Sequence, residues 1–486
     1  MTAAEKRYFR SFARRHIIGE ENLYLTLFDL IDRQTVSGAY NEAELLKKAS
    51  AVKRTAQLSN IKNYLHGLIL RSMRLFSDEA NVTRTLQARI ADIQFLLDKG
   101  LHAKASEVLR KSRKLAHLYE KHLYELQLIS IERKLMRFTS VKNARSQLTE
   151  TLRAEKQLIG LIQNESEMAN LYDQVFMLIR SGLVAEEQQR MAHKLAAHPL
   201  ISEKRSHSTF SVEVLRLLSL SDLMLLCGDD KRSRSALRQL INLYDRHPHQ
   251  FHDEPLRYIN ILNNYLNTCF RLQRFDEFPG LIRRMLQLGV TPAARFEIFK
   301  NATFLQLLYL INTRRFEEGL KLVPHIEEGL RKFDKKLPLT RKLSYCYNVM
   351  MLYFFTGHFH ESLRWAGKLL ERDYPDVRRD LQHAALLFRL VILFERGHHD
   401  TLDNMLRSTR RRLHKTEQLL AFEQFLIGLL QELLDSSDLR ARKAVFKQGL
   451  TFFEEQVPEF RKTLLADEIK IWMTARATGQ ELISLF

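Results

Sequence analysis

The chain has 486 residues, of which 45% are hydrophobic and 27% charged, and its formal net charge is +19. A single hydrophobic core stops growing near about 250–300 residues, so this chain must divide into domains or extend as a repeat array. The sequence holds 17 Gly and 9 Pro, which is too few to punctuate many short strands or long flexible linkers.

The first 80 residues lack the repeated pattern found further along the chain. The opening MTAAEKRYFRSFARRHII carries charges where a signal peptide needs an apolar core, and no apolar run reaches the about 18–20 residues of a membrane span. Two or three helices are predicted, with a break at 35–41 and a strongly apolar helix at 61–76. We expect a soluble cytoplasmic protein in which 1–80 form an N-terminal helical cap, because a helical array otherwise exposes its first apolar face.

Residues 51–150 hold 19 basic and 9 acidic residues, a net charge of +10. The helix predicted after Gly100 turns Leu101, Val108, Leu115 and Tyr119 inward. Its flanks and outer face then carry a candidate basic surface, formed by Lys104, Arg110, Lys111, Arg113, Lys114 and Lys121. Two interpretations remain open: a solvated helix face, or a surface that contacts the phosphates of a nucleic acid.

Short turn signals recur between amphipathic segments. They lie at Gly100, Gly182, Gly228, Gln273, Arg314, Gly357, Gly397 and Ser437. Successive separations are 82, 46, 45, 41, 43, 40 and 40 residues, so the mean is close to 42 if the first interval holds two units. That interval includes 145–180, which is predicted either as one long helix or as a hairpin whose turn is not readable.

Proline supports the same division of the chain, because it is poorly tolerated inside helices. Six prolines follow the turn signals by 17–24 residues, at positions 199, 248, 292, 338, 375 and 458. After position 375, an apolar stripe of helical spacing is formed by Leu381, Ala384, Ala385, Phe388, Val391 and Ile392. The predicted unit is therefore a helix, a tight turn, a second helix and a looser joint.

The phrases TGHFHESLRWAGKLLE (356–371) and TRRFEEGLKLV (313–323) place an aromatic residue directly after the turn. In these phrases the chain resembles the tetratricopeptide-repeat superfamily, in its broad sense of stacked antiparallel helical hairpins. The period near 42 differs from the family's about 34, and the Trp-x2-Leu-Gly-x2-Tyr opening is absent, so no binding residues are carried over. The predicted fold is an all-α solenoid with a repeat array at 81–460 and a C-terminal capping helix and tail at 461–486.

Sequence motifs of common enzyme classes are absent, including GxGxxG, GxxxxGK[ST], GxSxG and HExxH. His247, His249 and His252, with Asp253, form the best metal candidate, but polar residues are also expected at an ordinary joint between repeats. We expect no enzyme activity, no metal and no cofactor. The leading hypothesis is a scaffold that binds a protein partner of unknown identity, and the alternative is a nucleic-acid-binding or regulatory protein that uses the basic region 51–150.

Overall fold

The computed structural model describes residues 1–15, 23–37, 41–43, 45, 55–77, 81–138, 144–203, 208–289, 291–370, 377–415, 421–436, 438–456, 460 and 463–485. Throughout these ranges the chain forms helices joined by turns, without any strand, which confirms the all-α prediction. It separates into two compact units, Met1–Glu254 and Pro255–Phe486. The predicted limits of the caps and the repeat array, at 80/81 and 460/461, stay predictions.

The first unit begins with helices that share a small core of their own. These are α1 (Ala3–Arg14), α2 (Leu23–Ser37) and α4 (Thr55–Ser77). Thr2 and Glu5 form a capping box that starts α1. Phe9, Leu27 and Leu65 are buried at the centre of this core. Helix α2 continues through 35–37, the start of the predicted break, and 38–40 lie outside the described residues.

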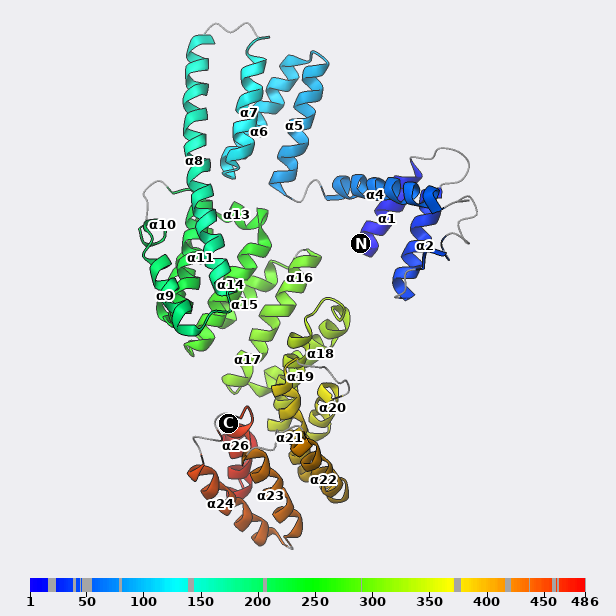
Figure 1. The fold of residues 1–486 in the computed structure, drawn as a ribbon, viewed down its shortest axis with the longest axis vertical. Helices are drawn as coiled ribbons and strands as arrows, with labels where there is room; N and C mark the ends of the chain where they lie inside the picture. Colours follow the sequence, from blue (N-terminus) through cyan, green and yellow to red (C-terminus); the bar gives the residue numbers. More distant parts are fainter. Residues whose placement is uncertain are drawn as a thin grey trace. The chain divides into compact units, whose positions relative to one another are not determined.

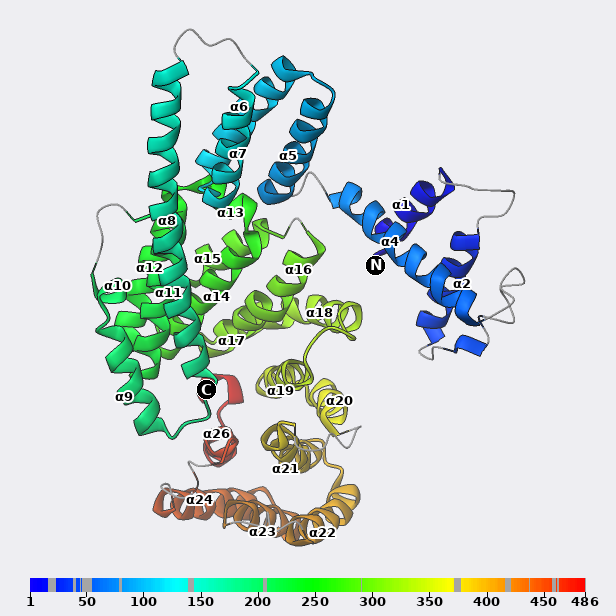
Figure 2. The same cartoon turned by 45° about the horizontal axis from the view of Figure 1, so that its top comes forward.

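The rest of the first unit is built mainly from longer helices. They are α5 (Val82–Asp98), α6 (His102–Leu118), α7 (His122–Leu135), α8 (Ala144–Ile179), α9 (Ala185–Ala196), α10 (Pro199–Ser202), α11 (Phe210–Leu226), α12 (Asp230–Arg246) and α13 (Pro248–Asp253). Helices α5, α6, α7 and the N-terminal half of α8 lie side by side in chain order (Figure 1, Figure 2). The structure therefore forms one helix of 36 residues at Ala144–Ile179, and not a hairpin. Its C-terminal half packs against α9 and α11.

Most of the second unit shares one continuous hydrophobic core. Its helices are α14 (Pro255–Arg271), α15 (Phe278–Gln287), α16 (Pro292–Ile298), the π-helical turn η1 (Phe299–Thr303), α17 (Phe304–Asn312), α18 (Phe316–Lys332), α19 (Leu339–Phe355), α20 (Phe359–Leu370), α21 (Arg379–Glu395), α22 (His399–Lys415), α23 (Ala421–Asp435), α24 (Leu439–Glu455), α26 (Ala466–Thr478) and α27 (Leu482–Leu485). From α17 to α24 each helix packs against the next, and α19 also packs against α17 and α21. The core therefore runs along the unit from Phe299 to Leu482.

The turns predicted from the sequence share one backbone conformation. A positive φ occurs at Gly100, Gly182, Gly228, Gln273, Arg314, Gly357 and Gly397. At six of them the following N–H donates to the carbonyl five residues earlier, as Leu101 does to Leu96 at 2.9 Å and His358 to Tyr353 at 2.8 Å. This is the hydrogen bond of a Schellman motif, which satisfies a free carbonyl at the end of a helix. Ser437 lies outside the described residues.

Prolines begin helices where the sequence predicts joints. Pro199, Pro248 and Pro292 start α10, α13 and α16, and Pro338 caps α19. Proline is suited to this first position, because its missing N–H has no intrahelical partner there. Positions 375 and 458 lie outside the described residues.

The apolar stripe predicted for α21 is confirmed, but the one predicted for α6 is partly wrong. All six stripe residues of α21 are buried. Leu101, by contrast, is 53% exposed. The buried positions of α6 are Ala105, Leu109, Ser112 and Ala116. Because α5 and α7 both pack against α6, Leu109 and three small side chains face them, while Val108, Leu115 and Tyr119 are only partly buried.

Candidate functional site

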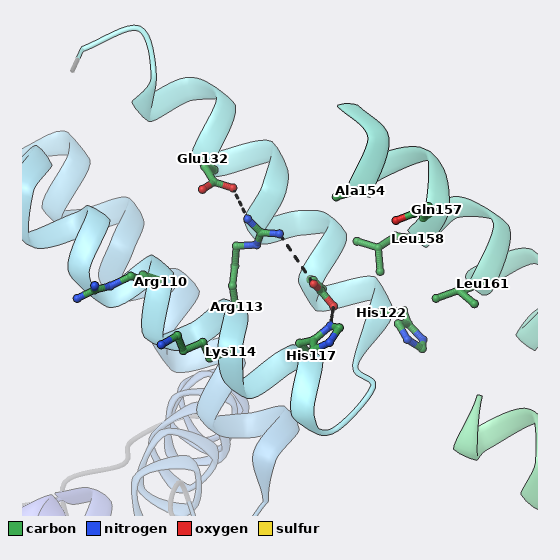
Figure 3. A pocket seen from close by; sticks show the side chains of 11 residues that line it. Arg110, Arg113, Lys114, His117, His122, Glu132, Ala154, Gln157, Leu158 and Leu161 are labelled. Carbon is green, nitrogen blue, oxygen red and sulfur yellow. Dashed lines mark hydrogen bonds and ion pairs between the residues drawn. The ribbon is translucent and has the colours of Figure 1, made fainter. Parts of the chain in front are cut away.

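A cavity of about 500 Å³ opens between α6, α7 and α8 in the region of highest positive charge (Figure 3). Its lining consists of Arg110, Arg113, Lys114, His117, His122, Glu125, Glu132, Ala154, Gln157, Leu158 and Leu161. Helix α6 supplies the cations, α7 supplies both carboxylates, and α8 supplies the apolar side chains. The three helices thus give the cavity three chemically different sides.

The α6 side carries two cations that have no counter-ion in the described part of the chain. Arg110 and Lys114 are four residues apart, so they share one face of the helix, and both side chains are exposed. No ion pair or hydrogen bond joins either of them to a described residue. Their charge is therefore available to a bound anion.

The α7 side carries Glu132 and the more deeply placed Glu125. Arg113 Nη1 donates to Glu132 Oε2 at 2.7 Å, and Arg113 Nη2 lies 3.9 Å from Glu125 Oε1. Glu125 is only 7% exposed, and its Oε2 is 3.5 Å from His117 Nδ1. Both Glu125 Oε2 and Arg113 Nε are buried without a hydrogen-bond partner among the described residues. Arg113 and His117 of α6 therefore lie next to the enclosed Glu125 carboxylate.

His122 connects α7 to α8 at the inner end of the cavity. Its Nδ1 lies 2.9 Å from Glu165 Oε1, which also accepts from the Thr209 hydroxyl at 3.2 Å. Burial lowers the pKa of His122, but the hydrogen bond to Glu165 and the charges of Glu120 and Glu125 outweigh it, so the pKa is raised. The contact between His122 and Glu165 therefore joins α7 to α8.

The α8 side is apolar, with Leu158 buried and Ala154 and Leu161 half-buried. Figure 3 shows these residues across the cavity from Arg110 and Lys114, with Glu132 between the two sides. Arg133 on α7 and Glu155 on α8 form an ion pair of 2.9 Å that holds the neighbouring turns together. The separation of charge and apolar surface is therefore fixed by helix packing.

The other candidates of the basic surface are engaged elsewhere. Lys104 and Lys111 both pair with Glu107, at 2.7 and 2.8 Å, and these ion pairs lower the pKa of Glu107 to about 2. Lys121 Nζ lies 2.8 Å from Asp253 Oδ2, a carboxylate with no exposed surface. Of the six predicted residues, the structure brings Arg110, Arg113 and Lys114 into one site and leaves Lys104, Lys111 and Lys121 outside it.

In the described part of the histidine cluster, His247 and His249 pack against aromatic rings. His247 packs edge-on against Phe210, and His249 packs edge-on against Tyr119. Asp253 is occupied by Lys121 and by the Val82 N–H at 2.9 Å, and the side chain of His252 lies outside the described set. Within the described ranges, no group of three or more His, Cys, Asp or Glu side chains is arranged to hold a metal ion.

Sequence reasoning did not find Glu125, Glu132, His122 or the apolar residues of α8 as members of a site. Each has the helical spacing of an ordinary packing or surface residue. Only the packing of α8 on α7 brings them to the basic helix. A signal existed for Glu132 alone, since an acidic residue near a basic helix is a natural counter-ion.

The chain defines an all-helical protein with a charged, partly apolar cavity. Comparisons with known proteins give no match to a family model, a curated protein or a solved structure. None of the helices described combines the length and apolarity needed to cross a bilayer.

Proposed function

We propose that this protein is a non-enzymatic scaffold, an α-solenoid of tetratricopeptide-like helical hairpins, that holds a segment of a partner protein. The observation that carries the proposal is the open cavity between α6, α7 and α8, with its two unpaired cations and its apolar α8 side. A surface of this kind suits a peptide, which binds through several modest contacts of different chemistry.

The fold supports the same proposal. Turns with a positive φ recur at intervals of 40–46 residues from Gly182 to Gly397. All of them except the turn at Gly182 also have the Schellman hydrogen bond. From α5 to α13, and again from α14 to α24, each described helix packs against the next. In the second unit α19 also contacts α17 and α21, and α21 also contacts α23. This contact pattern is typical of stacked hairpins, whose extended surfaces serve in protein binding.

Affinity purification of the tagged full-length protein from its own cells, with and without nuclease, tests the proposal. We expect protein partners in stoichiometric amounts that survive nuclease treatment. Repeated purifications under native conditions that return no protein partner count against the scaffold.

The alternative, nucleic-acid binding by 51–150, is tested by the same experiment. It predicts bound nucleic acid that is lost at high salt, because phosphate contacts release counter-ions. Lys104, Lys111, Arg113 and Lys121 are already paired with carboxylates. Of the six candidate residues only Arg110 and Lys114 remain unpaired, which is few for a surface that must follow a phosphate backbone, so we favour the protein partner.

A further inference from the structure

We propose that the cavity between α6, α7 and α8 binds a peptide segment that presents an acidic side chain next to an apolar one. This inference rests on the proposed scaffold function and names the chemistry of the partner that the scaffold holds. It is carried by the unpaired cations of α6 and by the apolar side that α8 gives the same cavity.

Arg110 and Lys114 are the expected binding partners of the acidic side chain. The two lie one helical turn apart on the rim of the cavity, and no described carboxylate neutralises them. A carboxylate can bind the planar guanidinium through two hydrogen bonds while the ammonium contributes a third. An Asp or Glu of the partner would therefore complete the charge balance of this rim.

The apolar side chain of the peptide is expected to pack on the α8 side of the cavity. Ala154, Leu158 and Leu161 line the cavity opposite the cations, as Figure 3 shows. An aliphatic side chain covering Ala154 and Leu161 removes apolar surface from water on both partners. A segment that is only acidic leaves this side uncovered and binds less tightly.

The same geometry disfavours a nucleic acid. Glu125 and Glu132 lie inside the cavity, so a phosphate entering it meets two carboxylates, while Arg113 is already held by them. A peptide brings one negative charge to the rim and a neutral backbone to the interior. A polyanion brings charge to both and is repelled by the interior.

The test is selection of random dodecapeptides displayed on phage against the full-length protein, followed by fluorescence anisotropy with the labelled consensus peptide. We expect the selected peptides to carry Asp or Glu within a few residues of Leu, Ile, Phe or Met. The double variant Arg110→Ala/Lys114→Ala should weaken binding by about tenfold. The matched control Lys104→Ala/Lys111→Ala removes the same charge from the same helix outside the cavity and should leave affinity within about twofold.

Circular dichroism and thermal melting of each variant separate loss of binding from loss of fold. An unlabelled 20-nucleotide single strand, used as a competitor, should not displace the labelled peptide at physiological salt.

Several outcomes overturn the proposal. Selected peptides without acidic residues, equal binding by both double variants, or displacement by the oligonucleotide each contradict it. Partner proteins that purify equally well with wild type and Arg110→Ala/Lys114→Ala leave the scaffold function standing and place binding elsewhere. Absence of any protein partner removes the scaffold function itself.

Discussion

Lys121 connects the turn between α6 and α7 to α13 instead of facing solvent. Its side chain is 18% exposed, and it lies 2.8 Å from the fully buried Asp253 carboxylate, which also accepts from the Val82 N–H at the start of α5. A charge identified as part of a basic surface is thus a structural tie between segments more than a hundred residues apart.

Replacing this lysine should destabilise the fold. Lys121→Met leaves the Asp253 charge buried with one remaining donor, and the loss of a partner from a buried pair costs about 3 kcal/mol or more. Denaturant unfolding followed by circular dichroism measures the change in the free energy of unfolding. Lys104→Met, which removes an exposed ion pair, is the control and should cost less than about 1 kcal/mol; equal effects of the two substitutions would contradict a buried tie.

Glu468 on α26 gives the second unit a pH dependence. Burial raises the pKa of its carboxyl from 4.5 to about 7, with a smaller contribution from Asp467. The folded state therefore keeps a proton that the unfolded state releases, so stability falls as the pH rises from about 4.5 through about 7. Glu468→Gln should raise the melting temperature at pH 8 and leave it nearly unchanged at pH 4.

The expected gain at pH 8 is roughly 1–3 kcal/mol, since one pKa unit corresponds to about 1.4 kcal/mol and relaxation reduces the effect. Melting curves of wild type and variant between pH 4 and pH 8 test the prediction. Parallel curves over the whole range would show that Glu468 is not the group responsible.

At the scale of the elements, the turns with a positive φ contain glycine at some positions and residues with a side chain at others. Gln273 and Arg314 have φ values of 53° and 59°, while Gly357 has a φ of 74° in an equivalent turn. For a residue with a Cβ atom this left-handed conformation costs about 1–2 kcal/mol. The Schellman hydrogen bonds hold Gln273 and Arg314 there nevertheless.

Glycine at either position should stabilise the protein. We expect Gln273→Gly and Arg314→Gly each to raise the free energy of unfolding by about 0.5–1 kcal/mol, because relief of strain exceeds the added entropy of the unfolded chain. Gly357→Ala should lower it by about 1 kcal/mol for the opposite reason. Differential scanning calorimetry of the three variants checks whether the two directions differ.

Helix α18 approaches η1 at Gly329, which leaves no room for a side chain. A Cβ atom on Gly329 would lie 2.0 Å from Cε2 of Phe299. Phe299 cannot move aside easily, because its ring stacks on Tyr345 and its carbonyl accepts the Tyr345 hydroxyl at 2.6 Å. Close approach of the two helices therefore depends on this single missing carbon.

Gly329→Ala should cost about 2–3 kcal/mol through overpacking. Gly367→Ala is a matched control in α20 of the same unit, because nothing lies within 4 Å of its added Cβ. The control should be neutral or stabilise by up to about 1 kcal/mol through helix propensity. Chemical denaturation of both variants gives the two values, and a neutral Gly329→Ala would refute the close contact.

At the scale of the whole molecule, the buried cores differ in size. The core shared by α1, α2 and α4 contains a few fully buried side chains such as Phe9 and Leu27. The core of the second unit extends from Phe299 to Leu482, and α19 and α21 bury residues around most of their circumference. Regions with fewer buried apolar contacts open at lower free energy.

We expect unfolding to proceed in steps. Amides of α1, α2 and α4 should exchange with solvent first, and those of α19 and α21 last, in native-state hydrogen exchange at increasing denaturant. One cooperative transition for all amides would contradict separate cores and would indicate a single folding unit.

The sequence by itself determined the helical class, most turn positions and the buried stripe of α21. These features depend on local chemistry: glycine at positive φ, proline at helix starts, and apolar residues at helical spacing. Where the local sequence carried no signal, tertiary packing determined the backbone conformation. Glu120 adopts a φ of 50° between α6 and α7 without a glycine to mark the turn, and Ala144–Ile179 forms one helix because α7, α9 and α11 pack along it.

The candidate site shows the same division. The sequence placed Arg110, Arg113 and Lys114 on a basic helix, but it also included Lys104, Lys111 and Lys121, because spacing alone does not reveal counter-ions. Glu107 is local to α6, whereas Asp253 and the carboxylates of α7 come from other segments. Only the tertiary structure decided which of these charges are neutralised. It also decided that the apolar side of α8 lies opposite Arg110 and Lys114. Both results depend on contacts between residues far apart in the chain.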